Sequence, residues 1–289
     1  MSHSKCSVFT YDNFVHAFGG AAGSIFTMLC FYPLEILKFR MQLGDAELLN
    51  KSTTIALLHI LKTEGVEALY RGVTPCLSSL AISNFVFFYS FHSLKSLKIG
   101  TLNNTAKLDM MLSFLAGFVN ICLTTPLWVV NYRLKIGKQQ CFTGLLDGML
   151  YIATREGIGA LWTGFIPSLM LLANPVIHFT VYEYLKRCIQ VKSSWSYFYM
   201  GAISKTIATL LTYPLQLVQT KQRIEKNFSP GTLALILAIV KKDGPGALFC
   251  GLESKLLQTV LMAAMTFMTY EKIIVLVFRI LKANEFRKL

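Results

Sequence analysis

The sequence is short of charge, and acidic residues are its scarcest charged class. Only 15% of its 289 residues are charged, 54% are hydrophobic, and the mean hydropathy is +0.51. An ordinary soluble domain carries about 25% charged residues, so this composition argues against that class and favours a membrane protein. Lys and Arg outnumber Asp and Glu by 28 to 15. The net charge of +13 would suit anionic cargo or anionic lipid head groups.

Features typical of several other protein classes are missing. The seven cysteines are odd in number and form no CxxC, which argues against a disulfide framework. No aromatic-interleaved basic stripe or zinc-type spacing accompanies the positive charge, so we expect neither a nucleic-acid partner nor a metal site. No nucleophile, base and acid share an element, so an enzyme is not expected. The N-terminus MSHSKCSVFTYD lacks a signal-peptide core and an Arg-rich presequence, so targeting information would be internal.

Long hydrophobic runs, by contrast, are abundant. Four windows contain no Asp, Glu, Lys or Arg and reach the about 20 residues that a helix needs to cross a bilayer; they are residues 13–34, 72–94, 110–132 and 157–182. Two further stretches, 195–219 and 256–280, qualify except for a few charged residues, among them Lys205 and Glu271. The sequence therefore predicts an all-α membrane protein with six transmembrane helices.

Three motifs recur in three copies and keep one register. PLEILKFR, PLWVVNYR and PLQLVQTK begin at Pro33, Pro126 and Pro214. An acid-glycine motif follows each proline after 29 to 31 residues, as EGVEALYRG, EGIGALWTG and DGPGALFCG. A third motif, FHSLK, YEYLK or YEKII, follows the prolines after 56 to 58 residues. Chance explains this agreement poorly.

The register predicts a single domain, residues 1–289, built from three repeats at about 12–100, 107–191 and 195–280. Each repeat would be a pair of membrane helices joined by a loop that contains a short helix. Packed around a pseudo-threefold axis, the six helices would enclose a central cavity, where polar groups can survive inside a bilayer.

PxExxK followed by EGxxxLYRG, repeated about every 90 residues, resembles the mitochondrial carrier family, solute carrier family 25, over residues 12–280. Within the family, three stretches most resemble the peroxisomal membrane carrier for coenzyme A, FAD and NAD. They are NFVFFYSFHSLKSL, TTPLWVVNYRLK and ESKLLQTVLMAAMTFMTYEK. The resemblance implies solute exchange by alternating access, with one gate at each end of the cavity.

The resemblance further implies an antiporter of adenine-containing cofactors and nucleotides, namely coenzyme A, FAD, NAD and AMP, in the peroxisomal membrane. These molecules would be transported substrates, and no bound cofactor is expected. The expected partners are these small anions, membrane lipids and peroxisomal membrane-protein import factors. Two alternatives stay open: a nucleotide or anion carrier of the mitochondrial inner membrane, and a carrier-like tether or adaptor that has lost transport. Lys205 and Asn120 argue against the tether, because an inert scaffold has little reason to keep them inside a membrane.

The prolines would kink their helices toward the axis, and the resemblance places the matrix-side gate there, which we call the proline gate. In the family an acid stands two residues after each proline and a base five residues after it. Only the first repeat has both, as Glu35 and Lys38. The other repeats have uncharged residues at these positions: Trp128 and Asn131, Gln216 and Gln219. The family's ring order would pair Glu35 with Asn131 and Lys38 with Gln216, so we expect a hydrogen-bonded gate that is weaker than an ionic one.

The opposite gate also has fewer charges than the family pattern. Its acid and base positions, in the third motif, are His92 and Lys95 in the first repeat and Glu183 and Lys186 in the second. In the third repeat Glu271 is followed by an isoleucine, so at most two ion pairs are expected. His92 is either a group that changes charge near neutral pH or an ordinary polar residue.

Lys205 is the most informative single charge, because a lysine deep in a membrane helix is costly unless it faces water or an anion. Counting about 100° per residue places Lys205 on the same helix face as Gln219, and Asn120 on the same face as Asn131. We expect Lys205 to bind a phosphate of the cargo; snorkelling or a structural role is the alternative. The family's contact positions on the second, fourth and sixth helices, with their neighbours, add Ser79, Ser83, Asn84, Met170, Leu171, Asn174, His178, Lys255, Gln258 and Thr259.

Overall fold

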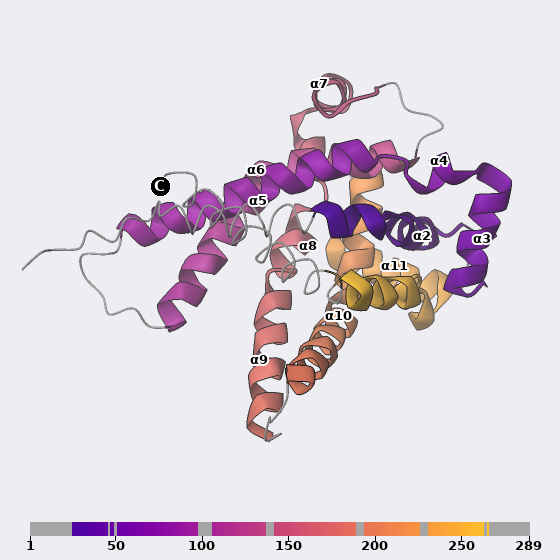
Figure 1. Ribbon diagram of the computed structural model, residues 1–289. Coiled ribbons are helices and arrows are strands. Elements are labelled where there is room, and N and C mark those ends of the chain that lie inside the picture. The colour runs from indigo at the N-terminus through magenta and orange to yellow at the C-terminus, as the bar shows by residue number, and fades with distance from the viewer. Residues whose placement is uncertain are drawn as a thin grey trace, which may run out of the picture. The chain divides into compact units, whose positions relative to one another are not determined.

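The computed structural model describes residues 25–45, 47–48, 51–97, 106–136, 142–188, 194–225, 231–262 and 265 (Figure 1). These residues form helices and irregular connections, and no strand occurs among them. The chain divides into two compact units, residues 1–32 with 257–289 and residues 33–256. The all-α fold expected from the sequence is confirmed.

Along the chain, the helices follow the order of the three sequence repeats, and Figure 1 labels most of them. The first repeat contributes α2 (Tyr32–Leu43), α3 (Thr53–Glu64), α4 (Val66–Leu69) and α5 (Val73–Leu97). The second contributes α6 (Ala106–Ile136), α7 (Leu145–Arg155), the 3-10 helix η1 (Ile158–Trp162), α8 (Phe165–Met170) and α9 (Ala173–Cys188). The third contributes α10 (Ser194–Ile224), α11 (Thr232–Asp243), η2 (Pro245–Phe249) and a helical segment at 252–262. α5 packs along α6, and α9 packs along α10.

Three helical stretches of the described residues are long and apolar enough to cross a membrane: Val66–Lys95, Leu108–Ile136 and Ile158–Cys188. They correspond to the second, third and fourth predicted spans. α10 covers the fifth predicted span as one continuous helix. Lys205 and several Ser, Thr and Tyr residues keep the mean hydropathy of α10 below that of the other three stretches. Most of the first and sixth predicted spans, including Glu271, lies outside the described residues.

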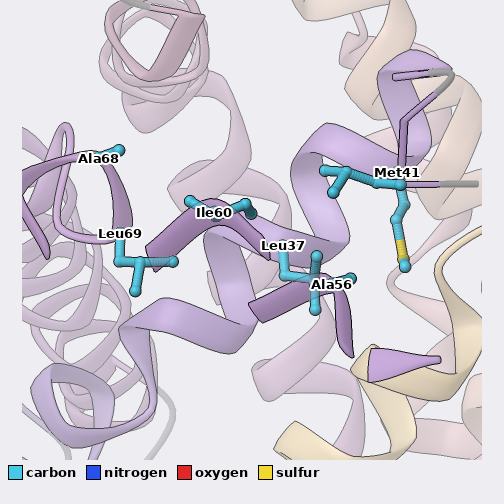
Figure 2. Packing of buried hydrophobic residues seen from close by; sticks show 7 residues of the cluster. Leu37, Met41, Ala56, Ile60, Ala68 and Leu69 are labelled. Carbon is cyan, nitrogen blue, oxygen red and sulfur yellow. The ribbon is translucent and has the colours of Figure 1, made fainter. Parts of the chain in front are cut away.

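Each repeat has its own hydrophobic core, in which the residue four positions after the proline packs on the loop helix. In the first repeat Leu37 of α2 meets Ala56 and Ile60 of α3 (Figure 2). The second core consists of Val129, Val130, Phe142, Ile152 and Leu161, and the third of Leu217, Val218, Leu235, Ile239 and Leu248. Burying one such side chain stabilises the fold by roughly 1.5–3 kcal/mol, so each proline helix is fixed to its loop helix by this face.

The acid-glycine motifs are tight turns that return the chain to the proline helix. The first and last glycines of every motif have positive φ, between 73° and 93°, which side-chain-bearing residues rarely adopt. Each of the first two turns presents its acid to the arginine seven positions after the proline. Arg40 donates two hydrogen bonds to Glu64, and Arg133 Nη1 lies 2.7 Å from both carboxylate oxygens of Glu156.

The prolines fit their helices because other groups satisfy the backbone. Pro126 lies inside α6 and has no N–H, so the carbonyl of Cys122 loses its helical partner. Trp162 of η1 donates its indole N–H to this carbonyl at 3.0 Å. The Thr125 hydroxyl donates to the carbonyl of Ile121 at 2.5 Å, which strengthens the same turn. Pro33 is instead the second residue of α2, where helices tolerate proline.

Candidate functional site

Lys205 of α10 points at a neutral group of the neighbouring helix. Its Nζ donates to Oδ1 of Asn174 in α9 at 3.1 Å. The Asn174 amide nitrogen donates in turn to the Thr212 hydroxyl at 2.7 Å and to the Ala208 carbonyl at 3.2 Å. Gln216 Nε2 reaches the same hydroxyl at 3.3 Å. A chain of hydrogen bonds therefore runs from Lys205 through Asn174 and Thr212 to Gln216, one of the proline-gate positions.

The predicted contacts on the fourth span lie at a break in the helix. We expected 157–182 to be one span, but α8 ends at Met170 and α9 begins at Ala173, with a turn between them. Pro175 explains the break, because it has no N–H to offer the carbonyl of Leu171. That carbonyl accepts a hydrogen bond from the backbone N–H of Asn174 at 3.0 Å. Met170, Leu171 and Asn174 thus share one turn, and His178 follows one turn later, beside Gly201 and within electrostatic range of Lys205.

A second polar pair joins α5 to α6. Asn120 Nδ2 donates to the Ser83 hydroxyl at 3.0 Å, and the same hydroxyl lies 3.2 Å from Asn120 Oδ1. Ser79 is buried and donates to the carbonyl of Pro75 within its own helix. Asn84 is partly buried. Among the described residues, no hydrogen bond connects this pair to Lys205 and Asn174.

The start of the sixth helix adds a second cation. Lys255 lies within electrostatic range of Lys205 and also of Glu35 and Lys38 at the proline gate. Lys255 is one of the contact positions expected on the sixth helix. Gln258 and Thr259 lie further along the helical segment 252–262, beyond the end of the larger unit.

The proline gate differs from the expected arrangement. Glu35 pairs with Lys38 of the same helix, whose Nζ lies 2.8 and 2.9 Å from the two carboxylate oxygens. The expected partners do not take part, because Gln216 donates to Thr212 and neither side-chain amide atom of Asn131 has a hydrogen bond of normal geometry among the described residues. Asn131 is fully buried against the thiol of Cys76. The second partner of Glu35 is Lys135, at 3.5 Å.

Three further residues of the proline gate are Gln219, Trp128 and Pro214. Gln219 crosses to the second repeat and donates to the Ser168 hydroxyl at 2.7 Å. Trp128 is partly buried on α6, and among the described residues its indole makes no hydrogen bond. Pro214 lies inside α10, as Pro126 does inside α6.

Sequence reasoning missed a layer one turn beyond the expected gate. Lys135 lies 5.0 Å from the ring centre of Tyr132, and the guanidinium carbon of Arg223 lies 5.1 Å from the same ring. Phe39 meets Tyr132 edge to face at 5.7 Å. Lys135 and Arg223 stand nine positions after their prolines, and Phe39 and Tyr132 six positions after theirs. Extending the repeat register by one turn would have found all four.

In the described part of the opposite gate, no acid position pairs with the base position of another repeat. Lys95 pairs with Asp109 at the start of α6, at 3.1 Å, which joins the first repeat to the second. Glu183 and Lys186 approach each other within α9 at 4.0 Å. His92 is exposed and packs edge to face on Phe91. The Lys95–Asp109 pair at this end is partly exposed, whereas the Glu35–Lys135 pair at the proline gate is buried.

The described residues contain no group of three or more His, Cys, Asp or Glu side chains that could hold a metal ion. Instead they combine membrane-length helices in a threefold repeat, polar groups between those helices and a gate at the prolines. These features define a membrane transport protein. A family model described as "Mitochondrial carrier protein" matches residues 10–101, 103–193 and 190–280, and the chain belongs to this family of solute transporters.

Three relatives of the chain within this family are peroxisomal proteins. The chain is 44% identical to mouse "Peroxisomal membrane protein PMP34", over 95% of this chain and 97% of that protein. It is 26% identical to the Arabidopsis thaliana "Peroxisomal nicotinamide adenine dinucleotide carrier", over 91% and 96% of the two chains. It is also 26% identical to Candida boidinii "Peroxisomal membrane protein PMP47B", over 95% and 89%. With its membrane-length helices, the chain is a multi-pass protein of the peroxisomal membrane.

Proposed function

We propose that this chain exchanges adenine-containing cofactors and nucleotides, namely coenzyme A, FAD, NAD and AMP, across the peroxisomal membrane by alternating access. The observation that carries the proposal is Lys205, a cation within a membrane helix whose hydrogen-bond partner, Asn174, is neutral. A neutral partner leaves the positive charge available, and a phosphate would satisfy it. The name of the Arabidopsis relative, an NAD carrier, supports the same class of cargo.

The neighbouring groups suit the rest of such a molecule. The broken turn at Met170, Leu171 and Asn174 offers apolar surface and hydrogen-bonding groups, which an adenine ring requires. Lys255 supplies a second positive charge for a further phosphate, and the Ser83–Asn120 pair supplies neutral donors and acceptors. Import into the membrane by peroxisomal membrane-protein import factors belongs to the same proposal.

The decisive experiment is exchange in proteoliposomes. The full chain is reconstituted in vesicles loaded with coenzyme A, and uptake of external FAD, NAD, AMP, ATP and carboxylates is measured. We expect exchange of the adenine-containing cofactors. Exchange of only ATP or carboxylates would favour an ordinary anion carrier instead, and no exchange of any solute would favour a tether or adaptor.

The variant Lys205→Ala tests the proposed phosphate contact. A charge-assisted hydrogen bond contributes roughly 1.5–3 kcal/mol, so we expect uptake of phosphate-bearing cargo to fall by about tenfold or more. Lys62→Ala, at an exposed lysine of α3, is the matched control and should leave uptake unchanged. Unchanged uptake by the Lys205 variant would show that Lys205 does not bind a phosphate of the cargo.

A further inference from the structure

We propose that Lys135 and Arg223 form a second layer of the proline gate, which substitutes for the ion pairs that the second and third repeats lack. The proposal rests on the alternating-access transport proposed above, because a gate has meaning only in a transporter. It concerns how the closed end is held, whatever the cargo.

The argument starts from which contacts can hold two helices together. Glu35 and Lys38 are three residues apart in α2, so their ion pair moves with that helix and does not resist opening. Lys135 comes from α6, and its contact with Glu35 at 3.5 Å joins the first repeat to the second. Both side chains are more than nine-tenths buried. A buried cation that loses its carboxylate partner is costly, so separating α2 from α6 is opposed by this contact.

The aromatic contacts extend the layer to the third repeat. The ring of Tyr132 lies between Lys135 and Arg223, at 5.0 and 5.1 Å, and cation–π attraction strengthens when the cation is desolvated. Lys135 also lies 5.8 Å from the ring centre of Phe39 in α2. Arg223 is buried and donates to the Ser168 hydroxyl at 3.1 Å, which ties α10 to α8. One compact layer therefore contains side chains of all three repeats.

The position in each helix also points to a gating role. Nine residues after a proline is one turn beyond the base position, and helical counting places it on the same face as the acid and base positions. Gln42 occupies this position in the first repeat, where it donates to the Tyr213 hydroxyl of α10 at 3.2 Å. The three residues at this position thus each reach a neighbouring repeat, as gate residues should.

The test combines a double-mutant cycle with a native thiol as reporter. The full-length variants Lys135→Met, Glu35→Gln and the double variant are purified in detergent, and their thermal unfolding is followed. In parallel, labelling of Cys76 by N-ethylmaleimide is measured by mass spectrometry. Cys76 is buried beside Asn131 at the gate, and the exposed Cys188 reports reagent activity. Lys62→Met is the matched control.

We expect Lys135→Met to raise the labelling rate of Cys76 several-fold and to lower the melting temperature. Lys62→Met should do neither, and Lys135→Arg should restore most of the wild-type behaviour. The double variant should melt above the value that adding the two single shifts predicts, because the pair can be broken only once.

Unchanged Cys76 labelling, or strictly additive shifts in melting temperature, would overturn the proposal. If Lys135→Met does not fold, Tyr132→Leu provides the same test, because it removes the ring that both cations share. Neither measurement uses a substrate. A protein that exchanges none of the tested cofactors would therefore still answer the question about the gate.

Discussion

Single residues show which parts of the site can be read from the sequence. The depth of Lys205 in an apolar stretch and simple helical counting predict that it faces the cavity and binds a phosphate of the cargo. The structure places its Nζ on Asn174 of α9, and the phosphate contact stays a prediction. The partners of Glu35 could not be predicted in this way, because a long lysine side chain reaches a full turn along its helix. Lys135 therefore occupies the place for which we had considered Asn131.

Trp162 is a residue whose role can be tested alone. Its indole N–H satisfies the Cys122 carbonyl that Pro126 leaves free, and Trp162→Phe keeps an aromatic ring while removing this donor. The loss of one hydrogen bond costs about 1 kcal/mol, which corresponds to a fall of roughly 2–4 °C in the melting temperature of a chain this large. Thermal unfolding in detergent measures the effect.

Trp128→Phe is the control for this prediction, because the Trp128 indole makes no hydrogen bond among the described residues. It should leave the melting temperature nearly unchanged. Equal shifts for the two variants would mean that the indole hydrogen bond contributes nothing.

At the scale of helices and turns, the repeat register predicted most of the structure. The loop helices α3, α7 and α11 occupy equivalent places because their prolines and acid-glycine motifs do. The break between α8 and α9 was missed, although Pro175 signals it. Hydropathy alone does not reveal this break, because no charged residue interrupts 157–182.

The last glycine of the second and of the third acid-glycine motif lies close to another repeat. A Cβ on Gly251 would lie 3.2 Å from the carbonyl oxygen of Lys38 and 3.1 Å from the Tyr213 hydroxyl, and its φ is +79°. Gly251→Ala should therefore destabilise the chain by about 1–3 kcal/mol through backbone strain and crowding. The measurement is again thermal unfolding.

Gly246→Ala is the matched substitution in the same motif. A Cβ there meets nothing within 4 Å, and Gly246 is not among the glycines with positive φ. We expect little change, or slight stabilisation because alanine restricts the unfolded chain. If both alanines behaved alike, the crowding at Lys38 would not limit stability.

On the scale of the whole molecule, Arg133 connects two repeats. It binds Glu156 of its own repeat, and it donates to the backbone carbonyls of Arg223 at 3.2 Å and Glu225 at 3.0 Å in the third repeat. The planar guanidinium can serve all these acceptors at once, whereas a lysine ammonium cannot. Arg133→Lys should therefore lower the melting temperature markedly.

Arg40→Lys provides the comparison. Arg40 stands at the equivalent position of the first repeat and pairs with Glu64, in a more exposed setting. It should cost less than Arg133→Lys, since a partly exposed pair contributes little. A larger effect at Arg40 would show that the link from Arg133 to the third repeat does not hold the repeats together.

The repeated proline helices divide their surfaces between two tasks. Position four after the proline packs on the loop helix, whereas Glu35, Gln219 and the residues at position nine contact other repeats. Folding and gating therefore depend on different faces of the same helix. A helix built in this way can exchange an acid for a tryptophan, or a base for an asparagine, without loosening its own core. The gate residues of such a helix can therefore vary in charge while its packing on the loop helix stays the same.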